Sequence, residues 1–242
     1  MNLIVDVGNT LVKFAVFQHS MLLVKVSAEL KLFSKEFKNI SKAYPNIERC
    51  IISSVGKLKK EQINLVKTKF KVLILDSETP LPFNNLYQTP KTLGVDRIAL
   101  VCAAVKQFPN KNVLIIDAGT CITYDFITQD KSYLGGAISP GIRLRYHALH
   151  NLTANLPLLN TEVPKSIIGT TTKTAIHSGV VFGILKEIDG VIEDYYKKYS
   201  DLTVILTGGD ANFLSKQLKN SIFANSNFLL EGLNFILEYN SN

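Results

Sequence analysis

The chain has 242 residues, of which 46% are hydrophobic and 19% are charged, so it is long enough for one large domain or two lobes with real cores. No apolar stretch reaches the roughly 18 residues that a membrane helix needs, and the N-terminus lacks the pattern of a signal peptide. We therefore expect a cytoplasmic protein that does not span a membrane. The three cysteines form no CxxC pair, and we expect all of them to be packing residues.

The net charge of +7 comes from one segment. Residues 31–71 contain eleven Lys or Arg residues against three Glu residues, and only one of the eleven is Arg. A nucleic-acid surface usually interleaves Arg with aromatic residues, which this segment does not do. We interpret it as lysine-rich helix faces in water and expect no nucleic-acid partner.

The first 110 residues alternate between strand and helix patterns. Short apolar runs between turn residues are typical of strands, and amphipathic runs stopped by proline are typical of helices. We expect strands at residues 3–6, 11–17, 21–30, 49–55 and 71–76, and helices at residues 31–44, 58–70 and 95–108. This alternation indicates an α/β arrangement.

The pattern then restarts. We expect strands at residues 112–117, 122–127, 132–139 and 202–210, and helices at residues 142–149, 174–199 and 229–239. The segments LIVDVGNTLVKFAVF and LIIDAGTCITYDFI match as strand, Asp, Gly, Thr and strand, with one residue fewer in the second turn. This internal repetition predicts two similar lobes, residues 1–110 and residues 111–242.

Each of the two turns places an aspartate, Asp6 or Asp117, at the end of a buried strand. A lone turn of this kind could be an ordinary hairpin. Together, however, the two turns offer glycine backbone that can approach phosphate oxygens closely, and N–H and Thr hydroxyl groups that can donate to them. The carboxylates would act through a cation. A third turn, Thr207-Gly-Gly-Asp-Ala211, would let a flat ring or a phosphate approach its backbone.

These three motifs, in this order, resemble the superfamily of actin, hexokinase and the heat-shock chaperone ATPases. Within it, the chain resembles type III pantothenate kinase from residue 2 to about residue 236. The segments that carry this resemblance are DVGNTLVKF, YQTPKTLGVDR, DAGTCITYD, YLGGAISPGI, GTTTKTAIHSG and TGGDA. The resemblance implies an α/β fold of two ribonuclease H-like lobes with a central interlobe cleft. It also implies a homodimer that phosphorylates pantothenate to 4'-phosphopantothenate with Mg-ATP, the first step of coenzyme A biosynthesis.

The resemblance also implies roles for individual residues. A primary alcohol needs a base to accept its proton, and Asp96 is the expected general base. Pantothenate is expected to contact Tyr87, Gly94, Val95, Asp96, Arg97 and Thr172. ATP is expected to contact Asp6, Val7, Gly8, Asn9, Thr10, Leu11, Val12, Lys13 and Thr120. Asp6 would hold Mg²⁺ directly or through water, and Asp117 would bind a monovalent cation, K⁺ or NH₄⁺.

Other functions stay open at this point. A ligand-sensing regulatory relative would bind nucleotide without needing a base. A phosphatase, or a kinase for another small molecule, could use the same phosphate turns. His147 and His150 have the spacing of a shared helix face, but without a cluster of Cys, Asp or Glu nearby we interpret them as ordinary surface residues.

Overall fold

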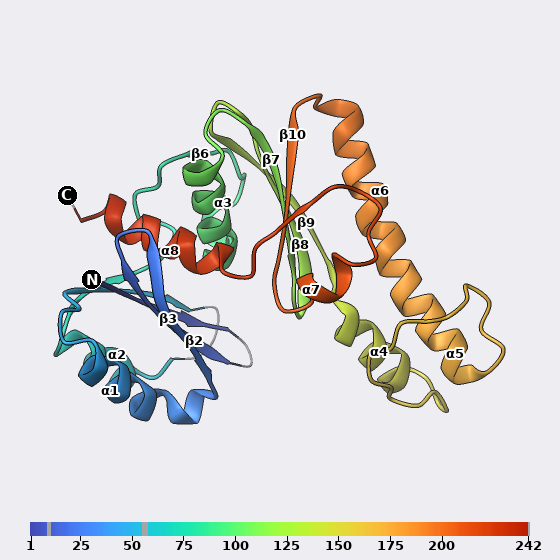
Figure 1. The fold of residues 1–242 in the computed structure, drawn as a ribbon, viewed down its shortest axis with the longest axis horizontal. Coiled ribbons are helices and arrows are strands. Elements are labelled where there is room, and N and C mark those ends of the chain that lie inside the picture. The colour runs from blue at the N-terminus through green and yellow to red at the C-terminus, as the bar shows by residue number, and fades with distance from the viewer. Residues whose placement is uncertain (9–10, 55–57, 242) are drawn as a thin grey trace. The chain divides into compact units, whose positions relative to one another are not determined.

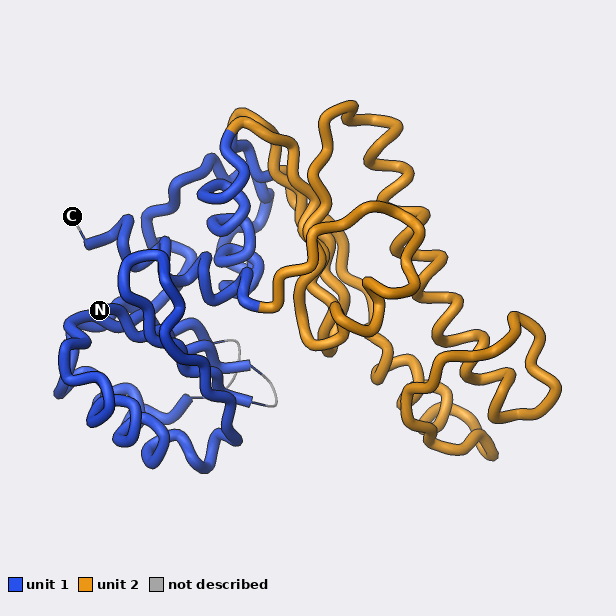
Figure 2. The backbone as a smooth tube through the Cα atoms, in the orientation of Figure 1, with its two compact units in different colours: residues 1–109, 131–133, 227–242 blue, residues 110–130, 134–226 orange. Residues whose placement is uncertain are grey.

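The computed structural model describes residues 1–8, 11–54 and 58–241 (Figure 1). Asn9, Thr10 and Val55, for which the sequence predicted ATP contacts and a strand end, lie outside these ranges. The chain forms two compact units, which Figure 2 shows in different colours. Unit 1 contains residues 1–109, 131–133 and 227–242, and unit 2 contains residues 110–130 and 134–226.

Unit 1 is built on a five-stranded sheet with the order β3-β2-β1-β4-β5. The strands are β1 (Asn2–Val7), β2 (Val12–Gln18), β3 (Met21–Ala28), β4 (Arg49–Ser54) and β5 (Lys71–Ile74). β1, β2 and β3 run antiparallel to one another, whereas β4 and β5 run parallel to β1. The parallel connections need crossovers, and the amphipathic helices that the sequence predicts supply them.

Helices cover both faces of this sheet. They are α1 (Phe33–Ala43, after a 3₁₀ turn at Leu30–Leu32), α2 (Lys60–Lys67), α3 (Val95–Gln107, after a 3₁₀ turn at Pro90–Thr92) and α8 (Phe228–Tyr239). The odd-numbered residues of β1 belong to a core with Phe33 and Phe37 of α1. On the opposite face, Asn2 Nδ2 donates to Asn234 Oδ1 of α8 at 2.9 Å. Even-numbered residues of β1 therefore face the side of α3 and α8.

Unit 2 repeats this strand order. Its strands are β7 (Asn112–Ala118), β8 (Cys121–Ile127), β9 (Ser132–Pro140, whose first two residues belong to unit 1), β10 (Leu202–Thr207) and β11 (Phe223–Ala224). Read from the opposite end, the order β9-β8-β7-β10-β11 corresponds to β3-β2-β1-β4-β5 of unit 1, with β10 and β11 in the places of β4 and β5. The predicted α/β fold with two ribonuclease H-like lobes is thus confirmed. In unit 1, the short strand β6 (Asn84–Asn85) pairs with Ser132 and Tyr133.

The helices of unit 2 are α4 (Ile142–Asn151), α5 (Thr172–His177), α6 (Gly183–Lys198) and α7 (Ala211–Leu214). The sequence predicted one helix over residues 174–199, and the structure instead has α5, a π-helical turn at Ser178–Phe182, and α6. The backbone stays in the helical region at both ends of the π turn, and apolar residues continue through it, so the sequence pattern predicts one helix. Within the described ranges, no helix is both long and apolar enough to cross a membrane.

The C-terminal helix belongs to unit 1, although the sequence-based division placed it in the second range. Gly232 explains how α8 packs so closely on α3. A Cβ at this position would lie 1.9 Å from the carbonyl oxygen of Ala99 and 3.2 Å from Cβ of Ala103. The two helix backbones meet where neither has a long side chain, and no periodicity within α8 reveals that partner.

We predict that Gly232→Ala destabilises the protein, because the added methyl group overlaps the backbone of α3. The expected loss is about 1–3 kcal/mol in the free energy of unfolding, measured by urea denaturation. Gly190→Ala in α6 is the matched control, since a Cβ there meets no atom within 4 Å. That variant should gain roughly 0.5–1 kcal/mol from its better helix propensity. Equal stability of the Gly232 variant and the wild type would contradict the proposed helix contact.

Candidate functional site

Asp6 lies near the end of β1, on the face that also carries Asn2 and Ile4. It is 6% exposed. Lys13 is directly opposite Asp6 in the register of β1 and β2, and Lys13 Nζ lies 3.6 Å from Asp6 Oδ2. The sequence placed both residues near the nucleotide, and the structure shows that they form one cross-strand ion pair.

Burial raises the pKa of the Asp6 carboxyl above its usual value. Lys13 opposes this shift, while the negative charge of Asp96 adds to it. Two carboxyl groups therefore repel each other here, and one lysine, which is half exposed, does not compensate fully. The electrostatics of this corner of unit 1 favour an additional cation.

Asp96 lies in the first turn of α3, where the helix dipole favours a carboxylate. Its Oδ1 accepts a hydrogen bond from the backbone N–H of Arg97 at 2.9 Å. Gly94 leaves room for this side chain, since a Cβ at Gly94 would lie 2.3 Å from Asp96 Oδ1. The resemblance implies that Gly94 contacts the substrate. The structure adds a second reason for glycine, because a side chain here would displace the Asp96 carboxylate.

Arg97 is 5% exposed, and its guanidinium lies over the ring of Tyr87, 5.5 Å from the centroid. Tyr87 in turn stacks on Tyr133 with ring centroids 6.1 Å apart, and Tyr133 makes an edge contact with Phe83 at 5.9 Å. This aromatic stack fixes the orientation of the cation. Tyr133 was not predicted as a site residue, although it lies at the start of the YLGGAISPGI segment.

The remaining positions expected to contact ATP in the first turn contribute mainly backbone. Val7 and Val12 are buried in the core of unit 1, so their side chains face away from solvent. Gly8 N–H donates to the carbonyl of Leu11 at 3.0 Å, which closes the described part of the turn. Val95 is half-buried in the first turn of α3.

Asp117 occupies the position in unit 2 that Asp6 occupies in unit 1. Its neighbours in the sheet are Thr123 of β8 and Thr207 of β10. The repeat therefore replaces the lysine opposite the first aspartate with a threonine opposite the second. Thr123 Oγ1 is buried and has no hydrogen-bond partner in the described part of the chain. This aspartate thus lies next to hydroxyl oxygens, a chemistry that suits a cation.

Backbone hydrogen bonds from two other segments fix the turn after Asp117. On one side, Gly141 N–H donates to the carbonyl of Thr120 at 3.0 Å. On the other, Asp210 N–H donates to the carbonyl of Ala118 at 2.9 Å. Gly208 has a φ of 96°, and a Cβ there would lie 2.4 Å from Asp117 Oδ1. Only glycine fits this left-handed position with so close a neighbour.

Two further residues near this turn are relevant. Burial raises the pKa of the Asp210 carboxyl, and the charge of Arg143 on α4 partly offsets this effect. Cys121, which we expected to be a packing residue, is exposed at the start of β8. It lies at the first position of the strand, whereas Cys50 and Cys102 are buried as expected.

Thr172 begins α5 in unit 2 and is exposed. Its neighbours Thr170 and Thr174 line a hollow of about 560 Å³ that also includes His177 and Glu162. Buried His177 links this hollow to α4, with Nδ1 2.7 Å from the hydroxyl of Tyr146 and Nε2 3.6 Å from Glu162 Oε2.

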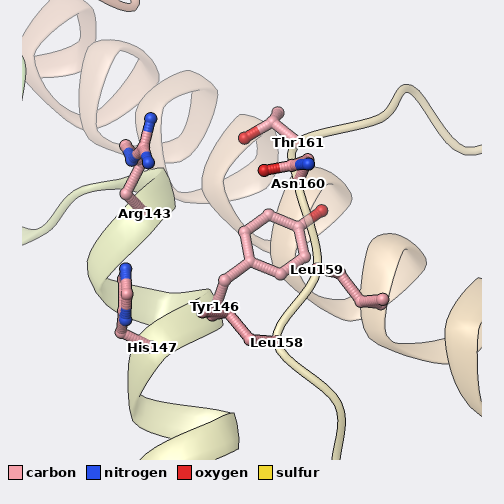
Figure 3. A pocket seen from close by; sticks show the side chains of 7 residues that line it. All are labelled: Arg143, Tyr146, His147, Leu158, Leu159, Asn160 and Thr161. Atoms are coloured by element: carbon pink, nitrogen blue, oxygen red, sulfur yellow. The ribbon is translucent and has the colours of Figure 1, made fainter.

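A smaller cavity of about 50 Å³ lies between α4 and the segment of residues 158–161 (Figure 3). It is lined by Arg143, Tyr146, His147, Leu158, Leu159, Asn160 and Thr161. Small-molecule sites usually measure roughly 300–1,000 Å³, so this cavity is too small for a nucleotide. Across the described ranges, no three His, Cys, Asp or Glu side chains cluster as a metal site, and the expectation for His147 and His150 is unchanged.

The structure thus places the predicted residues in two groups. In unit 1, Asp6 and Lys13 lie near Asp96, which is followed on α3 by Arg97 and its aromatic stack. In unit 2, the second and third turns contact each other through their backbones. Thr172 begins another element of unit 2, the helix α5.

We predict that Asp6→Asn stabilises the isolated protein at pH 7. Because the pKa of Asp6 is raised on folding, the folded state binds this proton more tightly than the unfolded state. Ionisation of Asp6 therefore costs stability at pH 7, and the cost disappears as the pH falls below about 4. Stability is measured by urea unfolding in EDTA without nucleotide. The free energy of unfolding of the variant should exceed that of the wild type at pH 7 and equal it at low pH. Asp194→Asn, in an exposed pair with Lys197, should change little. A less stable Asp6 variant at pH 7 would contradict this account.

Comparison with known structures supports the fold. A protein of Campylobacter jejuni assigned to the Baf family of transcriptional activators superposes with a TM-score of 0.67 and 25% identity, over 98% of both chains. A protein of Listeria monocytogenes named as a candidate N-acetylmannosamine kinase superposes with a TM-score of 0.57 and 11% identity, over 100% of this chain and 99% of that one. The second likeness concerns the fold alone.

Comparison of sequences identifies the family. The type III pantothenate kinase family model matches residues 2–194. A type III pantothenate kinase of Christiangramia forsetii is 55% identical over 240 residues, which cover 99% of each chain. The alignment therefore includes both units and every residue of the candidate site. On these matches, the chain belongs to the type III pantothenate kinase family.

Proposed function

We propose that the protein transfers a phosphoryl group from Mg-ATP to the primary hydroxyl of pantothenate. The product would be 4'-phosphopantothenate, and the reaction would be the first step of coenzyme A biosynthesis in the cytoplasm. The observation that carries the proposal is the grouping of Asp6, Lys13, Asp96 and Arg97 in unit 1 of a chain from this family. Phosphoryl transfer depends mainly on positioning and charge neutralisation, and this grouping offers charges of both signs.

Asp96 is the proposed general base. Its carboxylate would accept the hydroxyl proton while the new P–O bond forms. The bond from the Arg97 N–H orients one carboxylate oxygen and leaves the other available. The Arg97 guanidinium, stacked on Tyr87, would bind the carboxylate or a carbonyl of pantothenate. Gly94 and Val95 would bring backbone close to the same substrate.

Asp6 is the proposed contact to Mg²⁺, directly or through water. Mg²⁺ is usually held by one or two carboxylates together with substrate phosphates, which agrees with the lack of a three-ligand cluster among the described residues. The raised pKa of Asp6 beside Asp96 supports a cation at this position. Bound Mg²⁺ would neutralise phosphate charge, and Lys13 and the turn at residues 7–12 would orient the phosphates.

Asp117 is the proposed ligand of a monovalent cation, K⁺ or NH₄⁺. The support is the replacement of the lysine partner by Thr123, whose buried hydroxyl has no hydrogen-bond partner among the described residues. A positive ion would offset the repulsion between Asp117 and nucleotide phosphates. The exposed hydroxyl of Thr120 would contact those phosphates.

We also propose that the active form is a homodimer, in which Thr172 contributes to a pantothenate pocket shared by two subunits. Large apolar side chains are exposed in the part of unit 2 that precedes α5. They include Leu152 at 82%, Val163 at 53%, Ile167 at 70% and Ile168 at 75% exposure. The family resemblance implies that a second subunit would cover this apolar surface.

A ligand-sensing role is the alternative from another class, and the likeness to the Campylobacter jejuni protein motivates it. A sensor would bind ATP without turnover. A phosphatase would release phosphate from ATP without an acceptor. One experiment distinguishes the sensor and the phosphatase from the kinase. It measures ADP release by the purified protein with Mg-ATP and K⁺, with and without pantothenate.

We predict that Asp96→Asn lowers kcat for pantothenate-dependent ADP release by about 10²- to 10⁴-fold, the usual contribution of a general base. The affinity for ATP should change much less. Glu61→Gln is the matched control, because Glu61 is also an acidic residue in a first helical turn, in α2. It should keep wild-type activity. An Asp96 variant with wild-type kcat would exclude this residue as the base.

We further predict that Gly94→Ala lowers kcat by about tenfold or more while changing stability little. The added methyl group overlaps only the end of the Asp96 side chain, which can rotate away but then loses its bond to the Arg97 N–H. Misplacement of a catalytic group by about 1 Å can cost about 10²-fold in rate. Steady-state kinetics and thermal unfolding measure the two effects, and a large loss of stability would count against this explanation.

A further inference from the structure

A partly buried charge network in unit 2 has no part in the proposed chemistry. The guanidinium of Arg145, on α4, forms an ion pair with Glu187 of α6 through Nη2 and Oε2. Arg145 Nη2 also donates to Ser139 Oγ at 3.1 Å, and its Nε donates to the carbonyl of Pro140 at 3.0 Å. One side chain thus joins α6 to the corner between β9 and α4.

Glu187 is held from a second side. The hydroxyl of Tyr124, on β8, donates to Glu187 Oε1 at 2.9 Å. Burial by itself raises the pKa of the Glu187 carboxyl, but hydrogen bonds from Arg145, Ser139 and Tyr124 outweigh burial and lower it. The carboxylate therefore stays ionised at neutral pH and keeps the guanidinium in place. Partly buried ion pairs with several hydrogen bonds are stronger than fully exposed pairs.

The corner that Arg145 holds is the one that contacts the phosphate turn. Gly141 follows Pro140, its N–H donates to the Thr120 carbonyl at 3.0 Å, and its carbonyl accepts from the Arg145 N–H at 3.1 Å. A Cβ at Gly141 would lie 2.1 Å from the Gly119 carbonyl oxygen, so the two backbones are in direct contact. A shift of this corner must therefore move Gly119 and Thr120.

We propose that Arg145 and Glu187 are positioning residues for the nucleotide phosphates, acting through Gly141 on Thr120. The inference rests on the proposed role of Thr120 at the phosphates. With the pair intact, the corner at Pro140 and Gly141 is fixed to α6, and the turn presents one preorganised set of donors. Without it, the turn keeps its own hydrogen bonds but loses the rigid support behind it.

A merely structural pair would give a different result. It would lower the stability of unit 2 and the fraction of active enzyme, so kcat would fall while the KM values stayed constant. A positioning pair would weaken ATP binding and raise KM for ATP, while KM for pantothenate stayed the same.

The test compares Arg145→Gln, Arg145→Lys and Glu187→Gln with the wild type in the full-length chain, well below each Tm. We expect KM for ATP and the Kd for Mg-ATP, measured by calorimetry without pantothenate, to rise about tenfold in the two Gln variants. KM for pantothenate should change by less than about twofold. Arg145→Lys should not restore ATP affinity, because an ammonium cannot contact Glu187, Ser139 and Pro140 together.

Lys111→Gln is the matched control. Lys111 pairs with Asp201 at 2.7 Å in the same unit, and it directly precedes β7, which carries Asp117 at its other end. This exposed pair should leave both KM values unchanged. If an Arg145 variant fails to fold, Tyr124→Phe removes one bond to Glu187 and gives a smaller change in the same direction.

Unchanged ATP affinity in folded Gln variants would overturn the proposal, as would an equal rise in both KM values. If the wild type binds Mg-ATP but does not phosphorylate pantothenate, the proposed function fails, and the Kd values still decide the role of Arg145. A wild type that binds no ATP would overturn both.

Discussion

A buried carboxylate near the end of the central strand β1 is the constraint on which the site depends. Asp6 is buried beside Asp96, and burial together with like charge raises its pKa. Such an arrangement costs stability unless a cation compensates it. The sheet tolerates the cost because β1 lies between two strands and is packed on both faces, so the surrounding core fixes the side chain. In the proposed function, a metal-bound polyphosphate would supply that cation.

The two units share one strand order but differ in what faces the aspartate. Lys13 lies opposite Asp6, whereas Thr123 lies opposite Asp117. One unit therefore carries its own positive charge, and the other offers oxygen atoms. An internal repeat of this kind can keep its backbone while its side chains diverge, because register depends on the buried face and not on the polar end of a strand.

Three glycines allow the close contacts that shape the candidate site. Gly94, Gly141 and Gly208 each stand where a Cβ would overlap a carboxylate or a carbonyl oxygen. The partner of Gly94 is local, the Asp96 carboxylate two residues further on. The partners of Gly141 and Gly208 lie in the turn after Asp117, so tertiary contact requires glycine there. At Gly208 the left-handed backbone adds a local reason.

The sequence by itself determined the strands and most helices, since apolar periodicity is a local property, and the repeated aspartate, glycine and threonine turns indicated two lobes and a phosphate chemistry. It missed the short elements β6, α7 and β11, which have too few residues for a periodic signal. Only the tertiary structure decided that α8 belongs to unit 1, that Tyr133 supports Tyr87, and that Glu187 holds Arg145 across 42 positions of sequence. Such contacts join residues whose side chains are compatible with many partners, and the packing of the folded chain selects one of them.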